Sequence, residues 1–102
     1  MSDFVTIAKV SNVREGEGKV VEVNGKEIAL FNVEGKFYAI DNACRHKGGP
    51  LGESVLDGTT VTCPWHHWQY NVMTGISPVN PQIKVDTYEV KVEGDEVKVR
   101  VE

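Results

Sequence analysis

The chain has 102 residues, of which 40% are hydrophobic, so we expect one small domain with no room for a second. Its net charge is −4 and it contains no run of basic residues, which excludes nucleic acid as an expected partner. Its first residues lack the features of a signal peptide, and no stretch approaches the ~18 apolar residues of a membrane span. We therefore expect a cytoplasmic protein without a membrane segment.

Short alternating runs of apolar and polar residues, broken by glycine and asparagine, predict an all-β protein. Tight turns are expected at Asn24-Gly25, Glu34-Gly35 and Asp57-Gly58, and a closing hairpin around residues 93–96. In that hairpin the alternation predicts that Val90, Val92, Val97, Val99 and Val101 face the core. The predicted strands are Phe4–Val10, Lys19–Val23, Lys26–Val33, Lys36–Ile40, Val55-Leu56, Thr59–Thr62, Gln69–Val72, Tyr88–Val92 and Val97–Val101.

Both cysteines of the chain and two of its three histidines form two short pairs. Cys44 is followed by His46, and, after residues 47–62, Cys63 is followed by His66. Two such pairs on separate loops can hold one metal centre between them, and thiolate and imidazole ligands suit zinc and iron–sulfur sites. A disulfide between the two cysteines is the alternative for an oxidising compartment, but it would leave the two histidines unexplained.

The residues around these pairs resemble the cluster motif of Rieske proteins. The segment from Cys44 to Leu51 is similar to the family's C-x-H-x-G-x-x-L, and the segment from Cys63 to Tyr70 is similar to C-P-x-H-G-W-x-F/Y. One departure is His67, which stands where the family usually has glycine. Residues 77–81 resemble the proline-rich loop that covers the cluster in this family.

The resemblance implies a [2Fe–2S] cluster, with Cys44 and Cys63 on one iron and His46 and His66 on the other. It also implies an all-β fold, an antiparallel β-sandwich or barrel base with a small inserted cluster-binding subdomain at about residues 41–82, in one Rieske domain spanning residues 1–102. Two thiolates carry less negative charge than four, so such a cluster accepts an electron at a higher potential than a plant-type ferredoxin does.

Three residues near the second pair have expected roles of their own. In high-potential Rieske proteins, a tyrosine at the position of Tyr70 donates a hydrogen bond to a cysteine sulfur, and we expect Tyr70 to reach Cys44 in this way. Trp68 stands where those proteins have a serine that donates a second bond. His67 is expected outside the ligand set, and if the loop demands a positive φ there, histidine is tolerated better than a branched residue.

Three functions compete. The first is a soluble Rieske ferredoxin, which passes one electron at a time from a ferredoxin reductase to an oxygenase or other terminal redox enzyme. The second is a small electron-transfer subunit of a larger enzyme such as a nitrite reductase. The third is a structural zinc domain. No second His/carboxylate cluster follows Tyr70, so we expect an electron-transfer protein and not an enzyme in its own right.

Overall fold

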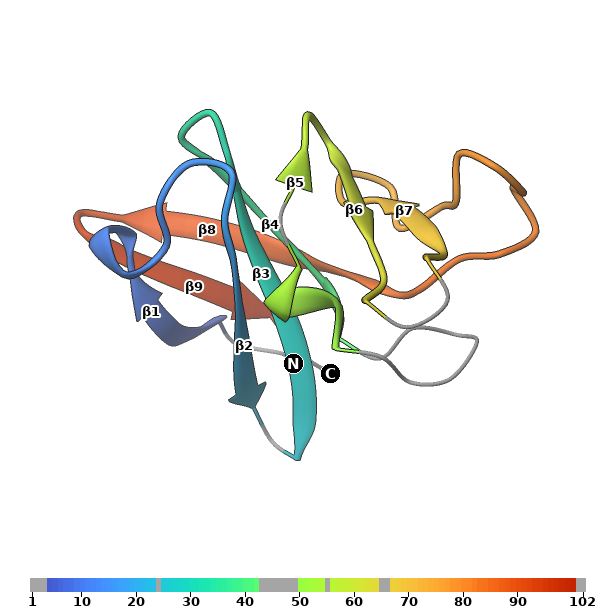
Figure 1. The fold of residues 1–102 in the computed structure, drawn as a ribbon. Coiled ribbons are helices and arrows are strands. Elements are labelled where there is room, and N and C mark those ends of the chain that lie inside the picture. The colour runs from blue at the N-terminus through green and yellow to red at the C-terminus, as the bar shows by residue number, and fades with distance from the viewer. Residues whose placement is uncertain (1–3, 24, 43–49, 55, 65–66, 101–102) are drawn as a thin grey trace.

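The computed structural model describes residues 4–23, 25–42, 50–54, 56–64 and 67–100. These residues form two antiparallel sheets, one with the strand order β1-β9-β8-β4-β3-β2 and one with the order β5-β6-β7 (Figure 1). The edge strands β1 and β2 of the larger sheet lie against each other, so this sheet curls toward a barrel. The strands are β1 (Phe4–Lys9), β2 (Gly18–Val23), β3 (Lys26–Val33), β4 (Lys36–Asp41), β5 (Leu56–Asp57), β6 (Thr60–Thr62), β7 (Gln69–Asn71), β8 (Thr87–Glu93) and β9 (Glu96–Arg100).

The all-β prediction is confirmed, and each predicted strand is present with ends that differ by about a residue. The sequence did not indicate two single-turn 3-10 helices, η1 (Val10–Asn12) and η2 (Leu51–Glu53). Both are far too short to cross a lipid bilayer, and the described part of the chain contains no longer helix.

The hairpin turns follow from backbone conformations that few residues adopt. At the β3–β4 turn, Glu34 (φ 51°) and Gly35 (φ 90°) are both left-handed, which matches the twist of the flanking strands. At the β5–β6 turn, Asp57 pairs with Thr60, so the loop residues are Gly58 and Thr59 and not the predicted Asp57-Gly58. The reason is that Gly58, with φ 65°, takes the first loop position, as in type II′ turns.

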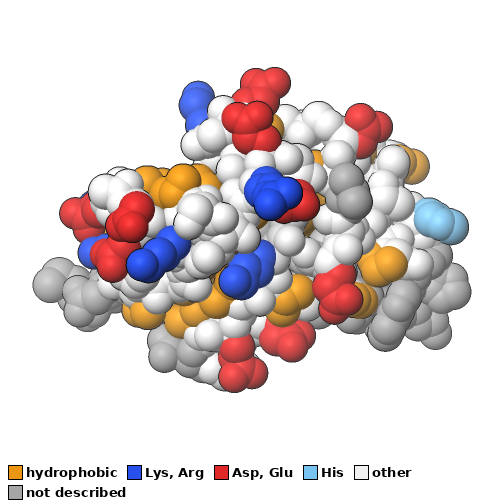
Figure 2. Space-filling model, turned by 60° about the vertical axis from the view of Figure 1, so that its left-hand side comes forward, with side chains coloured by type: hydrophobic (Ala, Val, Ile, Leu, Met, Phe, Trp, Pro, Cys, Tyr) orange, Lys and Arg blue, Asp and Glu red, His pale blue; other side chains and the backbone are white. Residues whose placement is uncertain are grey.

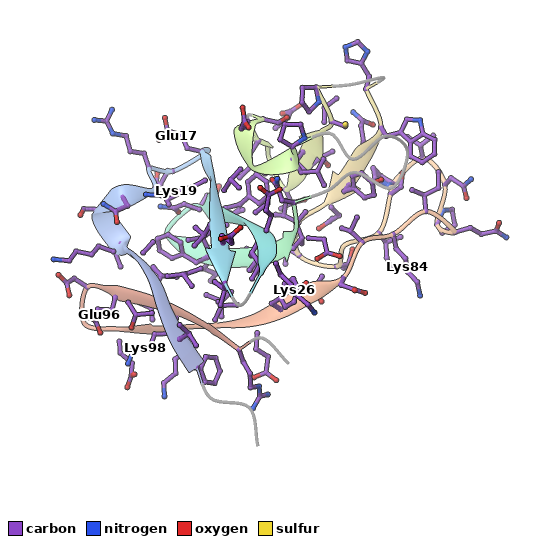
Figure 3. All side chains as sticks on the ribbon, turned by 90° about the horizontal axis from the view of Figure 1, so that it is seen from below. Glu17, Lys19, Lys26, Lys84, Glu96 and Lys98 are labelled. Carbon is purple, nitrogen blue, oxygen red and sulfur yellow. The ribbon has the colours of Figure 1, made fainter. Side chains whose placement is uncertain are left out.

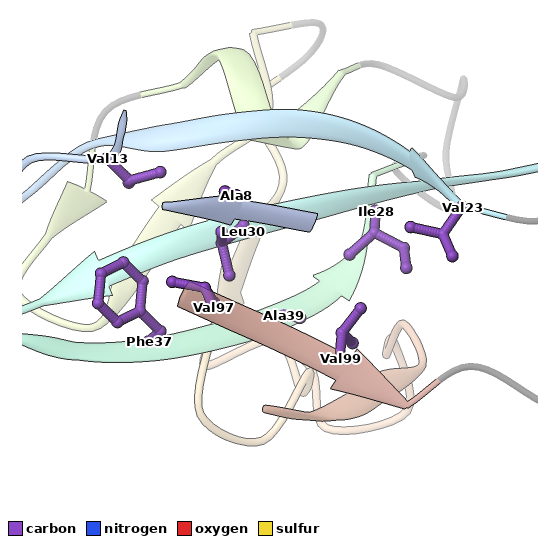
Figure 4. Packing of buried hydrophobic residues seen from close by; sticks show 9 residues of the cluster. All are labelled: Ala8, Val13, Val23, Ile28, Leu30, Phe37, Ala39, Val97 and Val99. Carbon is purple, nitrogen blue, oxygen red and sulfur yellow. The ribbon is translucent and has the colours of Figure 1, made fainter. Parts of the chain in front are cut away.

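Strand β3 contributes to two hydrophobic cores because successive side chains of a strand point to opposite faces. Ile28 and Leu30 lie in what we call the base core, whereas Ala29 and Phe31 lie in what we call the site core. The base core consists of Ala8, Val13, Val23, Ile28, Leu30, Phe37, Ala39, Val97 and Val99 (Figure 4). The site core consists of Ala29, Phe31, Ile40, Leu51, Val61, Cys63, Tyr70, Val72 and Val85, and it joins the small sheet to β3 and β4.

The closing hairpin only partly follows its predicted pattern. Val97 and Val99 are fully buried as expected, but Val92 is 47% exposed and that prediction is wrong. The cause is its position, because β9 has a strand on either side, whereas β8 beyond Tyr88 pairs with β9 alone. Val90 is half-buried, and Val101 lies outside the described residues.

Charged side chains line the solvent face of the same hairpin. The Lys98 ammonium lies 2.8 Å from a Glu93 carboxylate oxygen. This hydrogen bond and the attraction between the two charges lower the pKa of Glu93 and raise the pKa of Lys98. Both side chains reach solvent, so the pair contributes little to folding.

Candidate metal centre

The second ligand segment, residues 63–68, runs from the protein interior to the surface and back. Strand β6 ends at Thr62, and Cys63 directly after it is completely buried in the site core. Pro64 and His67 are exposed, and the chain returns to the sheet at β7. A hydrogen bond of 2.6 Å from the Cys63 N–H to the Trp68 carbonyl oxygen closes the segment at its base. Cys63 is therefore held inside, while Pro64 and His67 lie at the surface.

His67 adopts a left-handed backbone conformation, with φ 59°. This confirms that the segment demands a positive φ at the position where the family usually has glycine. The side chain is exposed and lines a groove of about 140 Å³ together with Trp68, Val79 and Ile83. His67 thus has its side chain on the surface, beside the predicted ligand His66.

Of the first ligand segment, residues 43–50, the structure describes only Pro50. Cys44 and His46 lie outside the described residues, as does His66. The chain leaves β4 at Asp41 and returns in η2, where Leu51 is buried in the site core beside Cys63. Of the four predicted ligands only Cys63 is thus placed, and the described residues contain no group of three potential metal ligands. The four-ligand set stays a prediction.

The proline-rich segment forms a compact loop that packs beside the second ligand segment. Ile76 pairs with Lys84 at its base, and the Ser77 N–H donates to the Ile83 carbonyl oxygen at 2.8 Å. The buried Ser77 hydroxyl accepts hydrogen bonds from the N–H groups of Val79 and Asn80, at 3.3 and 3.4 Å. The prolines were the sequence signal for this loop, but in the structure the Ser77 hydroxyl stabilises its turn.

Tyr70 and Trp68 flank Cys63 on the interior side. Tyr70 is fully buried in the site core and pairs with Val61 across β6 and β7, while Trp68 is half-buried against the same core. The predicted bond from Tyr70 to Cys44 involves a residue outside the described part of the chain, so it stays a prediction. The position of Tyr70 in the same core as Cys63 is compatible with it.

Among the residues that the structure describes, few charged ones lie beside the second ligand segment. From Gly58 to Ile83 the sequence contains no Asp, Glu, Lys or Arg. Met73, Ile76 and Val79 in this stretch are 50%, 39% and 76% exposed. On the face shown in Figure 2, the charged side chains of the described residues gather over the left and centre. Of the charged residues labelled in Figure 3, Glu17, Lys19, Lys26, Glu96 and Lys98 lie around the large sheet, and Lys84 lies toward the small one.

Comparison with known proteins agrees with this fold and site. The chain matches the Rieske [2Fe-2S] domain over residues 3–99. It is 38% identical over 101 residues to the ferredoxin component of the naphthalene 1,2-dioxygenase/salicylate 5-hydroxylase systems of a Ralstonia species, covering 98% of this chain and 97% of that one. The Sphingomonas yanoikuyae B1 ferredoxin superposes with a TM-score of 0.87 at 28% identity, over 98% and 100% of the two chains. A chain of the complex of reduced oxygenase and oxidized ferredoxin in carbazole 1,9a-dioxygenase superposes with a TM-score of 0.85 at 30% identity, over 95% and 92%.

The chain therefore belongs to the Rieske [2Fe-2S] domain family. Within that family it is a ferredoxin of the kind found in multicomponent oxygenase systems, an electron carrier and not the oxygenase itself. The predicted family, fold, cofactor and electron-transfer function are confirmed.

Proposed function

We propose that Cys44 and Cys63 bind one iron of the [2Fe–2S] cluster and that His46 and His66 bind the other. The protein then accepts one electron from a reductase and donates it to a terminal oxygenase. We also propose that residues 1–102 act as a single Rieske domain, with the cluster-binding subdomain at about residues 41–82. Two cysteines that serve as ligands must stay reduced, which favours the cytoplasm as the compartment.

The path of the second ligand segment supports this proposal most directly. A buried thiolate is costly unless a positive partner such as a metal ion compensates its charge, and Cys63 is completely buried. The exposed His67 shows that the chain reaches the surface by the residue after His66. A cysteine inside and a histidine near the surface fit a centre whose thiolates are shielded and whose imidazoles face the partner. When bound, a Rieske cluster supplies a one-electron couple with a potential of roughly −150 to +300 mV.

We propose that the uncharged surface beside this segment is where the terminal oxygenase docks. It is formed by Ile76, Val79 and the groove next to His67, and we call it the docking face. An electron leaving through the histidines must cross to a partner close by, so the partner has to cover this end of the molecule. Apolar side chains without neighbouring charges suit burial in such a contact.

Metal and sulfide analysis of the anaerobically purified protein tests the ligand set. We expect about two irons and two acid-labile sulfides per chain in the native protein. Cys63→Ser should lose the cluster because it removes a charged ligand, whereas His67→Ala should keep it because this neighbouring histidine is not a ligand. Stopped-flow mixing of the reduced protein with its terminal oxygenase should then show oxidation of the native cluster. Colourless protein with stoichiometric zinc, or an intact cluster in Cys63→Ser, would contradict the assignment.

A further inference from the structure

Asn42 closes the first ligand segment from within the protein. It directly follows β4, is only 3% exposed, and precedes Cys44 by two positions and His46 by four. We propose that Asn42 is a positioning residue for the cluster, one that fixes where the first ligand segment begins and ends. This inference rests on the proposed ligand set, to which it adds a residue that is not itself a ligand.

Two hydrogen bonds from one residue bring the ends of this segment together. The Asn42 carbonyl oxygen accepts the N–H of Leu51 at 2.8 Å, and its side-chain Oδ1 accepts the N–H of Gly52 at 2.7 Å. The chain therefore leaves and re-enters the fold at one point. Holding both ends of a segment reduces the conformational freedom that its ligands must lose when they bind a metal centre.

The same asparagine is fixed to the large sheet on its other side. Its N–H donates to the Glu27 carbonyl oxygen at 3.1 Å, and its side-chain Nδ2 lies 3.4 Å from Glu27 Oε1. Asn42 is thus bonded to the start of β3 as well as to the η2 turn. Its side chain cannot shift without breaking the contact to Gly52 or the contact to Glu27.

Gly52 allows this close approach, and Leu51 extends it to the other ligand segment. A Cβ atom at Gly52 would lie 3.0 Å from Asn42 Oδ1 and 2.8 Å from a methyl carbon of Val20. Leu51 is fully buried in the site core that also contains Cys63. The bonds of Asn42 therefore set the first ligand segment relative to the buried cysteine of the second.

Asn32 offers a matched control because it is also a buried asparagine whose side chain bonds two separate segments of the chain. It is 5% exposed, its Nδ2 donates to the Val13 carbonyl oxygen at 2.9 Å, and its Oδ1 accepts the Gly35 N–H at 2.9 Å. It lies near the end of β3, five positions beyond Glu27, which is about 17 Å along a strand. Loss of either side chain should weaken the fold, but only Asn42 borders a ligand segment.

The test compares the rate at which the loaded proteins lose their cluster to a chelator, followed by visible absorbance. Partners that orient metal ligands typically change metal affinity by about 10–100-fold, so we expect Asn42→Ala to release the cluster ~10–100 times faster than the native protein. Asn32→Ala should release it at close to the native rate. The electron paramagnetic resonance spectrum of the reduced cluster should change in Asn42→Ala and not in Asn32→Ala.

A charge-neutral exchange provides the rescue. In the double variant Glu27→Gln with Asn42→Asp, the carboxylate at position 42 still accepts from Gly52, and the new amide at position 27 donates in return. This variant should restore the native release rate and spectrum.

Equal acceleration by Asn42→Ala and Asn32→Ala would overturn the proposal, since it would show a general loss of stability. Failure of the exchange to restore the cluster, or failure of all three variants to assemble one, would overturn it too. Assembly in Asn32→Ala and in the exchange but not in Asn42→Ala would support it. A native protein without any cluster would instead refute the proposed ligand set, so the two failures are distinguishable.

Discussion

Two residues that follow Cys63 in the sequence, Tyr70 and His67, have opposite surroundings. Tyr70 is locked in the site core with no exposed surface, so its hydroxyl has a fixed place in the interior. His67 is exposed and has a left-handed backbone. For a residue with a Cβ atom, this conformation destabilises the folded state by roughly 1–2 kcal/mol. The interior residue is suited to tune the centre, whereas the exposed one is suited to meet a partner.

Replacing Tyr70 by phenylalanine should lower the reduction potential without loss of the cluster. A hydrogen bond to a charged sulfur is worth about 1.5–3 kcal/mol, of which ~1–2 kcal/mol is expected to appear only on reduction. At about 59 mV per tenfold change for one electron, this corresponds to a fall of roughly 40–85 mV. Protein-film voltammetry would measure it, with Tyr38→Phe as the control because Tyr38 is half-buried beside the same core on β4. If the two variants shift the potential equally, Tyr70 is merely packed beside the site.

The elements around the site are joined by backbone contacts that leave little space. Gly75 links the end of β7 to the segment before β8, because its N–H donates to the Asn71 carbonyl oxygen at 2.7 Å and its carbonyl oxygen accepts the Val85 N–H at 2.8 Å. Its backbone is left-handed, with φ 76°, and a Cβ there would lie 2.4 Å from the Val85 carbonyl oxygen. The proline-rich loop is anchored to the small sheet through this glycine.

Gly75→Ala should therefore destabilise the protein by about 2–4 kcal/mol, the sum of the left-handed cost and of the displaced backbone. Gly58→Ala is the control, since Gly58 is also left-handed but a Cβ there would meet nothing within 4 Å. It should cost only about 1–2 kcal/mol. Urea unfolding of the two variants, with equal m-values, gives the difference. If both variants lost the same unfolding free energy, the backbone near Val85 would be able to move away from the new methyl group without a loss of stability.

The sequence predicts these elements well where a pattern is local. Alternation located the strands, and the family's usual glycine indicated a left-handed backbone at the position of His67, which the structure has. It missed the exposure of Val92, because burial depends on which strands lie alongside. It also missed the hydrogen bonds of Asn42 and Ser77. The sequence alone does not distinguish a polar side chain that bonds to water from one that bonds to a buried N–H.

At the scale of the whole molecule, charge and apolar surface are separated. The charged residues of the chain lie outside residues 58–83, so the docking face has no charged residues of its own. At physiological salt, fields from such exposed charges fade within about 8 Å. Contact with the oxygenase should therefore depend on apolar burial more than on charge.

Val79→Ser should raise the concentration of this protein that half-saturates its oxygenase by about fivefold, as expected for about 1 kcal/mol of lost apolar burial. Val92→Ser is the matched control, because Val92 is an exposed valine on β8 outside the docking face. Steady-state turnover of the oxygenase, with this protein varied at low and at high salt, would measure both. If both variants raised the half-saturating concentration equally, or if turnover with the native protein fell steeply with salt, the oxygenase would bind another surface than the docking face.

The side chains of β3 specify the register in which the large sheet pairs. If the pairing of β3 slipped by one position, Ala29 and Phe31 would point into the base core, and Ile28 and Leu30 would point into the site core. Both cores would then contain side chains of the wrong size. The ring of Phe31 also demands Gly18 opposite it, where a Cβ atom would lie 2.5 Å from the ring, and a slipped strand would meet Glu17 or Lys19 instead. A chain whose Cys63 lies in a closed interior is therefore one whose large sheet has paired in register, so with the proposed ligand set we expect only correctly paired molecules to hold the cluster.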